Sequence, residues 1–328
     1  IIKPFSLEYI YYSIISKVLI VENDLHNDLP GYRFKDTFKV NLFHGMGIKK
    51  IYHSSKLISK LFKKNISNYL RKTLVGFCFT DTYDLIPVTN NFHRKKYISA
   101  FQNKNVHVLG QPRNDLLLKN DKFIRSKLLN SLNVKKSIKK IILYMPTFRD
   151  KNREYQNQNF FLEDEKLNIE LKKKKSILLL KHHFYHEKNI LFKKNFVKVN
   201  SNIFILSKFS ATYNLLKISD CLITDYSSIY IDYLLLNKPI FFYCYDINKY
   251  QSENREIYFN YFKDIFTPGK KIRKKKDMSK NIIKFLNEKK DIYKYKRKKS
   301  KKFFNFYLDQ NNSSRVFDHI CKKIKMFI

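Results

Sequence analysis

Three observations predict an α/β fold built from two halves. Short apolar runs rich in β-branched residues alternate with longer helix-like segments, the pattern of parallel strands that are buried on both faces. The 328 residues are 44% hydrophobic, so the chain can bury a sizeable core, and two domains fit this length better than one. Six glycines and seven prolines are too few for a fibrous or low-complexity protein.

The predicted strands are the apolar runs, and the polar stretches between them are predicted helices or connections. A polar segment at 121–138 precedes a fresh strand, which predicts two domains, 1–125 and 126–328, with ligands bound in a cleft beyond the strand ends. The predicted helices include 6–16 and 227–236. The predicted strands are 17–23, 39–45, 74–80, 106–110, 140–147, 176–183, 202–206, 220–225 and 239–246.

The C-terminal part, from about Asp277, is predicted to be helical and strongly basic. Within it, residues 293–306 interleave aromatic side chains with cations. Such a segment is either a solvated helix or a surface that docks onto an anionic membrane or polymer.

The charge is strongly positive, with 66 Lys and Arg against 28 Asp and Glu, a formal net charge of +38. Such a field attracts polyanions: nucleic acid, anionic lipid or an anionic polymer. The richness in Lys, Asn, Ile, Phe and Tyr also fits the codon bias of an AT-rich genome, so charge alone does not select a partner. The sequence has no nucleic-acid-binding signature, and a nucleic acid partner is not expected.

Cysteine usage and hydropathy predict a cytoplasmic location. The four cysteines are scattered without a CxxC pair, so neither a disulfide framework nor a metal site is expected. No signal peptide is visible, and the first residue, Ile1, suggests a fragment or a processed form. The longest apolar stretch, 9–21, carries Lys17 and is shorter than the roughly 20 residues of a membrane span.

The first candidate site segment is LFHGMGIKK, in which His44 leaves a predicted strand directly into a glycine-flanked turn. Gly45 lets the backbone approach a ligand closely. A histidine titrates near neutral pH and suits the role of general base, although a lone histidine is more often structural.

The second segment is GQPRNDLLL, which follows the strand at 106–110. Its glycine, proline, Asn and Asp predict a fixed turn that caps the next helix. Arg113 and Asp115 are therefore predicted to be mainly architectural, lining the cleft.

The third candidate is a pair of strand ends, LYMPTFRD and LLLKHH. They place Thr147, Arg149, Lys181 and His183 at the ends of neighbouring strands. Such donors can converge on phosphate groups.

The fourth segment contains LITDYSSIYID, in which a buried strand turns at Asp225 and enters a helix through Ser227 and Ser228. Hydroxyls and free amides at a helix start can bind an anion, although a plain serine cap has the same pattern. A pyrophosphate site needs additional cations, for which Arg255 and His183 are the candidates.

Together these segments resemble the CDP-glycerol glycerophosphotransferase family, which includes the polymerases and primases of wall teichoic acid. The resemblance covers about Val18 to Gly269, with the blocks in the family's order. The blocks are HGMGIK (44–49), GQPRND (110–115), LYMPTFRD (143–150), LITDYSSIYID (222–232) and KPIFFYCYDINKY (238–250).

The resemblance implies a GT-B-like architecture, in which two Rossmann-like domains face a cleft, with the N-terminal one truncated at its start. It also implies a peripheral enzyme on the inner face of the cell membrane. His44 matches the family's proposed base and His183 its second essential histidine. Donor phosphates would be bound by Thr147, Arg149, Lys181, Asp225, Ser227, Ser228 and Arg255, with Gly45, Lys49, Arg113, Asp115 and Asp232 lining the cleft.

Two positions depart from the family pattern. Phe43 replaces the tryptophan that precedes the HG pair, and Glu256 replaces the glycine that follows the arginine at 255. An acid at the second position puts the identity of the donor in question.

The implied reaction transfers glycerol phosphate, or a related polyol phosphate, from CDP-glycerol or CDP-ribitol to a polyanionic or lipid-linked acceptor, with release of CMP and without a cofactor. This chemistry belongs to teichoic acid or capsule synthesis. The alternative is a GT-B glycosyltransferase that uses a nucleotide sugar for a surface polysaccharide.

Overall fold

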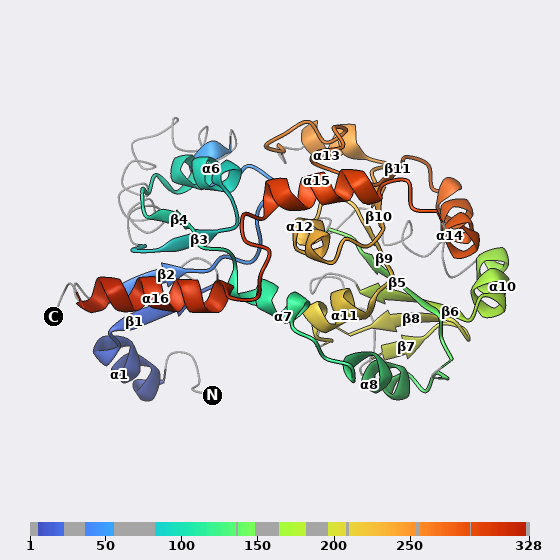
Figure 1. Ribbon diagram of the computed structural model, residues 1–328, viewed down its shortest axis with the longest axis horizontal. Coiled ribbons are helices and arrows are strands. Elements are labelled where there is room, and N and C mark those ends of the chain that lie inside the picture. The colour runs from blue at the N-terminus through green and yellow to red at the C-terminus, as the bar shows by residue number, and fades with distance from the viewer. Residues whose placement is uncertain are drawn as a thin grey trace. The chain divides into compact units, whose positions relative to one another are not determined.

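The computed structural model describes nine stretches of the chain, and their contacts divide it into two compact units (Figure 1). Unit 1 comprises Ile1–Asp115, Tyr250–Tyr258 and Phe303–Ile328, and unit 2 comprises Leu116–Lys249 and Phe259–Lys302. The described residues are 6–22, 37–55, 83–135, 137–147, 164–181, 196–207, 210–252, 256–288 and 290–325.

Unit 2 is built on a seven-stranded sheet (Figure 1). All neighbouring strands are parallel except the edge pair β7 and β8, which is antiparallel. The strands, in spatial order, are β11 (Lys270–Ile272), β10 (Ile240–Tyr243), β9 (Cys221–Thr224), β5 (Lys140–Met145), β6 (Ser176–Lys181), β8 (Ile203–Leu206) and β7 (Phe196–Lys198).

The central strands of this sheet form because their sequences are continuous apolar runs, as a sheet covered on both faces requires. Every residue of β6, β8 and β9 is buried. Two helices, α10 (Glu165–Lys173) and α14 (Asp277–Asn287), contribute apolar residues to the same core cluster. Met278, Ile282 and Leu286 recur every four residues and so form one buried stripe along α14.

Unit 1 holds two smaller parallel pairs, β1 (Val18–Val21) with β2 (Phe38–Asn41) and β3 (Ile86–Val88) with β4 (Val106–Val108). A parallel bridge between Val40 and Leu85 links the two pairs. The C-terminal helix α16 (Asn312–Lys325) adds Val316 and Ile320 to the core around these two residues.

The remaining described elements are helices and 3-10 turns. The α-helices are α1 (Leu7–Ile15), α6 (Asn91–Phe101), α7 (Asp115–Leu118), α8 (Ile124–Ser131), α11 (Thr212–Ile218), α12 (Ile229–Tyr233), α13 (Ile247–Ser252) and α15 (Lys294–Phe304), and the 3-10 turns are Tyr52–Ser54, Pro112–Asn114 and Leu234–Leu236.

The α/β class with a mostly parallel sheet is confirmed, and eight of the nine predicted strands overlap an observed strand. The ninth, 74–80, lies outside the described residues. The contacts group 303–328 and 250–258 with unit 1, whereas the sequence placed both segments in the second domain. The first change of unit falls after Asp115 rather than at 125.

No helix within the described stretches combines the length and the apolar character that crossing a membrane demands.

Candidate functional site

In unit 2, the ends of β5 and β9 are joined by a buried corner, which we call the Asp225 corner: Thr147 and Asp225. The Asp225 Oδ1 atom accepts hydrogen bonds from the Thr147 amide, at 2.8 Å, and from the Thr147 hydroxyl, at 2.6 Å. Tyr261 donates to the Asp225 carbonyl at 2.7 Å. Asp225 is only 2% exposed, so its carboxylate holds two strand ends together.

Lys181 ends β6, the strand next to β5, as the sequence predicted. Its ammonium group donates to the Ser207 carbonyl at 3.2 Å and the residue is buried. The Ser207 hydroxyl is buried and has no hydrogen-bond partner among the described residues. The carboxyl ends of β5, β6 and β9 thus bring Thr147, Lys181 and Asp225 to one edge of the sheet.

Ser227 and Ser228 follow the corner and are half-buried. Ser228 occupies the N-cap position of α12, but its hydroxyl caps no amide of that helix. The Ser227 hydroxyl accepts only a long hydrogen bond, 3.4 Å, from the Ile229 amide. Among the described residues, both hydroxyls therefore contribute little to the fold, in contrast to Asp225.

Two tyrosines fix the elements around these serines. Tyr226 donates to Asp246 at 2.9 Å, and burial together with that carboxylate raises the pKa of Tyr226 far above its usual range. Tyr213 donates to Asp232 at 2.7 Å. Asp232 is 2% exposed, so it orients α12 from within rather than presenting a carboxylate to a ligand.

In unit 1, His44 follows β2 and is exposed, on a turn that we call the His44 turn, residues 43–47. The turn is sharp: Phe43 has φ 51° and Gly45 has φ 151°, a region that favours glycine. The His44 imidazole lies against the Phe43 ring, with centroids 4.2 Å apart and 31° between planes. Phe43 itself is buried and so anchors the turn.

Tyr97, on α6, holds the His44 turn in place, a role that no pattern in the sequence predicted. Its hydroxyl donates to the Gly45 carbonyl at 2.9 Å and accepts from the Gly47 amide at 2.8 Å. Arg113 donates to the Phe43 carbonyl at 2.7 Å. The histidine is thus presented on a backbone that three hydrogen bonds from distant segments hold in place.

Residues 49–50 and 256–257 pair through a short antiparallel backbone contact. An antiparallel bridge joins Lys49 to Ile257, and the Lys50 amide donates to the Glu256 carbonyl at 2.7 Å. The Lys49 ammonium lies 5.5 Å from the centre of the Tyr250 ring. The Glu256 carboxylate is 3.3 Å from the Lys50 ammonium, so the unusual acid has a cation beside it.

Asp115 caps the C-terminal helix. Its Oδ1 atom accepts from the Asn312 amide at 3.0 Å, and its Oδ2 atom accepts from the Ser313 amide at 2.8 Å and the Ser313 hydroxyl at 2.7 Å. Gly110, with φ 84°, lies so close that a Cβ there would be 1.7 Å from the Asn312 side chain. The Asp115 carboxylate and the small size of Gly110 therefore allow the start of α16 to pack against residues 110–115.

Three predicted residues, Arg149, His183 and Arg255, lie outside the described residues. Their predicted roles stay predictions. Across the stretches that the structure describes, no group of three or more His, Cys, Asp or Glu side chains could hold a metal ion.

The chain belongs to the CDP-glycerol:poly(glycerophosphate) glycerophosphotransferase family, whose family model matches residues 1–322. It is 29% identical over 303 residues to a teichoic acid poly(glycerol phosphate) polymerase of Bacillus spizizenii, a match that covers 88% of this chain and 71% of that protein. It is 30% identical over 244 residues to the polymerase of the same name in Staphylococcus epidermidis, over 70% of this chain but only 31% of the relative.

A solved structure also supports the assignment of the chain to this family. The wall teichoic acid polymerase TagF matches with a TM-score of 0.78 and 25% identity, over 100% of this chain and 78% of the TagF chain. A TagF variant soaked with CDPG matches with the same TM-score over 99% of this chain. A Staphylococcus aureus MnaA–UDP structure, at 15% identity and a TM-score of 0.51, shares the fold alone.

Proposed function

We propose that this chain transfers glycerol phosphate, or a closely related polyol phosphate, from a CDP-polyol donor to an anionic or lipid-linked acceptor in the synthesis of a cell-envelope polymer. The observation that carries this proposal is the family match over residues 1–322. Relatives named for poly(glycerol phosphate) and poly(ribitol-phosphate) synthesis support a CDP-polyol donor.

The proposed reaction is a single displacement at the donor's β-phosphorus. The His44 imidazole takes the proton from a hydroxyl of the acceptor, and the hydroxyl oxygen forms the new bond to phosphorus. The bond between that phosphorus and the bridging oxygen breaks, and CMP leaves with the electron pair. A positioned base contributes roughly 10²–10⁴-fold to such a reaction, and the exposed, locked His44 turn supports this role.

Donor binding is assigned to unit 2. Ser227 and Ser228 are proposed to donate to the diphosphate, with Thr147 and Lys181 at the neighbouring strand ends. Arg149 and His183, and Arg255 from the segment that is grouped with unit 1, complete the set as charged donors, by resemblance to the family. Positioning and charge stabilisation by such groups would supply much of the remaining acceleration.

The architecture proposed for catalysis is GT-B-like, with the two units facing a cleft lined by Gly45 and Lys49. Arg113, Asp115 and Asp232 would support that lining, since their described contacts hold the His44 turn, α16 and α12.

We assign the protein to the inner face of the cell membrane as a peripheral protein. The cations of α15 and the exposed side chains of Ile292 and Tyr295, each 68% exposed, support docking to an anionic surface. Co-sedimentation with phosphatidylglycerol vesicles, but not with phosphatidylcholine vesicles, is the expected result; equal recovery with both would contradict it.

The reaction is tested by measuring nucleotide release from CDP-glycerol, CDP-ribitol and UDP-glucose in turn, with a poly(glycerol phosphate) acceptor present. We expect CMP from one or both CDP-polyols and no UDP from UDP-glucose. Release from UDP-glucose alone would instead indicate a glycosyltransferase of the same fold.

A further inference from the structure

A cavity of about 570 Å³ lies within unit 2, and none of the residues proposed for catalysis or donor binding lines it. It is lined by the starts of the strands: Lys140 begins β5, Ile240 begins β10 and Lys270 begins β11. Thr147 follows the other end of β5, a strand of six residues, so the two edges of the sheet are about 20 Å apart. The cavity therefore lies at the edge opposite the Asp225 corner.

This cavity, which we call the amino-edge cavity, has an apolar part and a charged part. Phe241 of β10 and Phe285 of α14 meet edge to face, with ring centroids 6.0 Å apart and planes at 84°. Pro239, Ile240, Ile292 and Tyr293 complete the apolar lining. A volume of this size that combines an apolar surface with charged side chains can hold a small molecule with an apolar part and a charged part.

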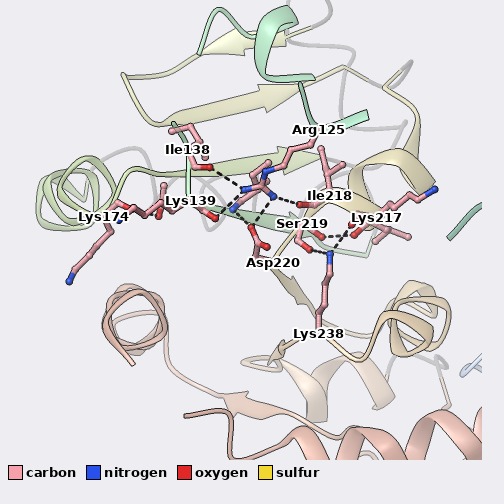
Figure 2. Close-up of polar contacts among 12 residues, drawn as sticks. Arg125, Ile138, Lys139, Lys174, Lys217, Ile218, Ser219, Asp220 and Lys238 are labelled. Atoms are coloured by element: carbon pink, nitrogen blue, oxygen red, sulfur yellow. Dashed lines mark hydrogen bonds and ion pairs between the residues drawn. The ribbon is translucent and has the colours of Figure 1, made fainter. Parts of the chain in front are cut away.

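The acids that line the amino-edge cavity are all engaged by cations. Asp220 accepts from Arg125 at 3.2 Å and from the Ile141 amide at 2.7 Å, and Figure 2 shows Arg125 also reaching the carbonyls at the start of β5. Asp291 accepts two hydrogen bonds from Arg297, which is 1% exposed. Glu288 is 3.3 Å from the Lys284 ammonium.

The cavity is lined by more lysines than acids. The Lys140 ammonium lies 4.3 Å from the centre of the Phe285 ring and donates to the Phe285 carbonyl at 2.8 Å. The side chains of Lys139, Lys270 and Lys290 are exposed and make no hydrogen bond or ion pair with any described residue. With the acids paired, these three cations leave a positive rim around an apolar interior.

We infer that the amino-edge cavity binds a phosphate monoester with an apolar body, the head group at the Lys139, Lys270 and Lys290 rim and the body against Phe241, Phe285 and Ile292. An apolar body removes ring and aliphatic surface from water, and a dianionic head group satisfies the lysines. This site is distinct from donor and acceptor binding and does not depend on the proposed function.

Isothermal titration calorimetry of the purified chain tests the inference with octyl phosphate, kept below its micellar concentration. We expect one octyl phosphate per chain, bound at least tenfold more tightly than inorganic phosphate and than octanol. Equal affinity for inorganic phosphate, or no binding of octyl phosphate, would overturn the inference. Equally tight binding of CMP that responds to the same substitutions would also overturn it, because the apolar body would then be irrelevant.

Two substitutions at the cavity and two matched controls locate the site. Lys139→Glu and Ile292→Ser change exposed side chains of the lining, and each is expected to weaken octyl phosphate binding at least fivefold. Lys298→Glu on α15 and Ile169→Ser on α10 make the same chemical changes at exposed positions outside the lining, and they should leave the affinity unchanged. An affinity insensitive to both lining substitutions, with unfolding temperatures equal to wild type, would place the binding elsewhere.

Discussion

The His44 turn and the Asp225 corner both follow the carboxyl end of a buried strand, yet they use their polar side chains in opposite ways. Asp225 is 2% exposed, and one of its carboxylate oxygens accepts two hydrogen bonds within the fold. His44 is exposed, while other residues, Tyr97 and Arg113, hold its backbone. A motif residue can therefore be required for the shape of a site or for its chemistry, and the burial of its side chain distinguishes the two roles.

The largest expected loss of stability comes from Asp225→Ala. Removing the carboxylate deletes both hydrogen bonds that buried Thr147 donates to it, so we expect the free energy of unfolding to fall by about 2–4 kcal/mol. Urea denaturation measures it. Asp225→Asn keeps the acceptor oxygen and is the control, with a loss of about 1 kcal/mol; equal losses for the two variants would refute the structural role.

Lowering the pH should destabilise unit 1, because the unfolded chain binds a proton at His93 more readily than the folded chain does. Burial lowers the pKa of His93 to about 3, whereas in the unfolded chain it titrates near 6.5, so the unfolded state takes up the proton first. The contribution of neutral His93 to the free energy of unfolding is fully present above pH 6.5. It is lost as the pH falls toward 3, by about 2 kcal/mol between pH 7 and 5. His93→Gln, which can still accept from Asn90, should show a correspondingly shallower pH dependence in urea denaturation; an unchanged slope would contradict this.

Tyr97→Phe should loosen the His44 turn without touching the histidine. Two hydrogen bonds disappear, so we expect a stability loss of about 1–2 kcal/mol. We also expect CMP release to slow by roughly tenfold, since the base is less well positioned. Tyr52→Phe, at a neighbouring aromatic position, is the comparison for a general packing effect. A destabilised Tyr97→Phe variant with full activity would show that the turn needs no lock.

The smallest effect is expected for Glu256→Gln. The carboxylate and the Lys50 ammonium are both partly exposed, and such pairs contribute about 0.2–1 kcal/mol. The change in unfolding free energy should shrink further in 0.5 M NaCl. A change that salt leaves untouched would point to a role for Glu256 other than this ion pair.

The sequence predicted the parts of the fold in which local pattern and final structure agree. The runs at 140–147, 176–183 and 220–225 are apolar throughout because the sheet covers both faces of β5, β6 and β9. Strand β3 was missed because it has three residues and a central proline, and β11 because two of its three residues are lysines. Both are stabilised by pairing partners far along the chain rather than by their own pattern.

The site was predictable only as a set of candidates. Thr147, Lys181 and Asp225 came together because parallel strands end at one edge of a sheet. Tyr97 is 50 residues from Gly47, whose amide donates to the tyrosine hydroxyl. A tyrosine within a helical segment does not by itself predict such a long-range hydrogen bond. The capping of α16 by Asp115 spans 197 residues, so the prediction of a cap named the wrong helix.

The most direct test of the account is the rate of CMP release from CDP-glycerol by His44→Ala, measured beside its urea denaturation curve. Because His44 is exposed and its turn is held by other residues, we predict a rate loss of roughly 10²–10⁴-fold with an unchanged free energy of unfolding. A variant with an intact fold and wild-type CMP release would contradict the assignment of His44 as the base and with it the division of roles between the two regions.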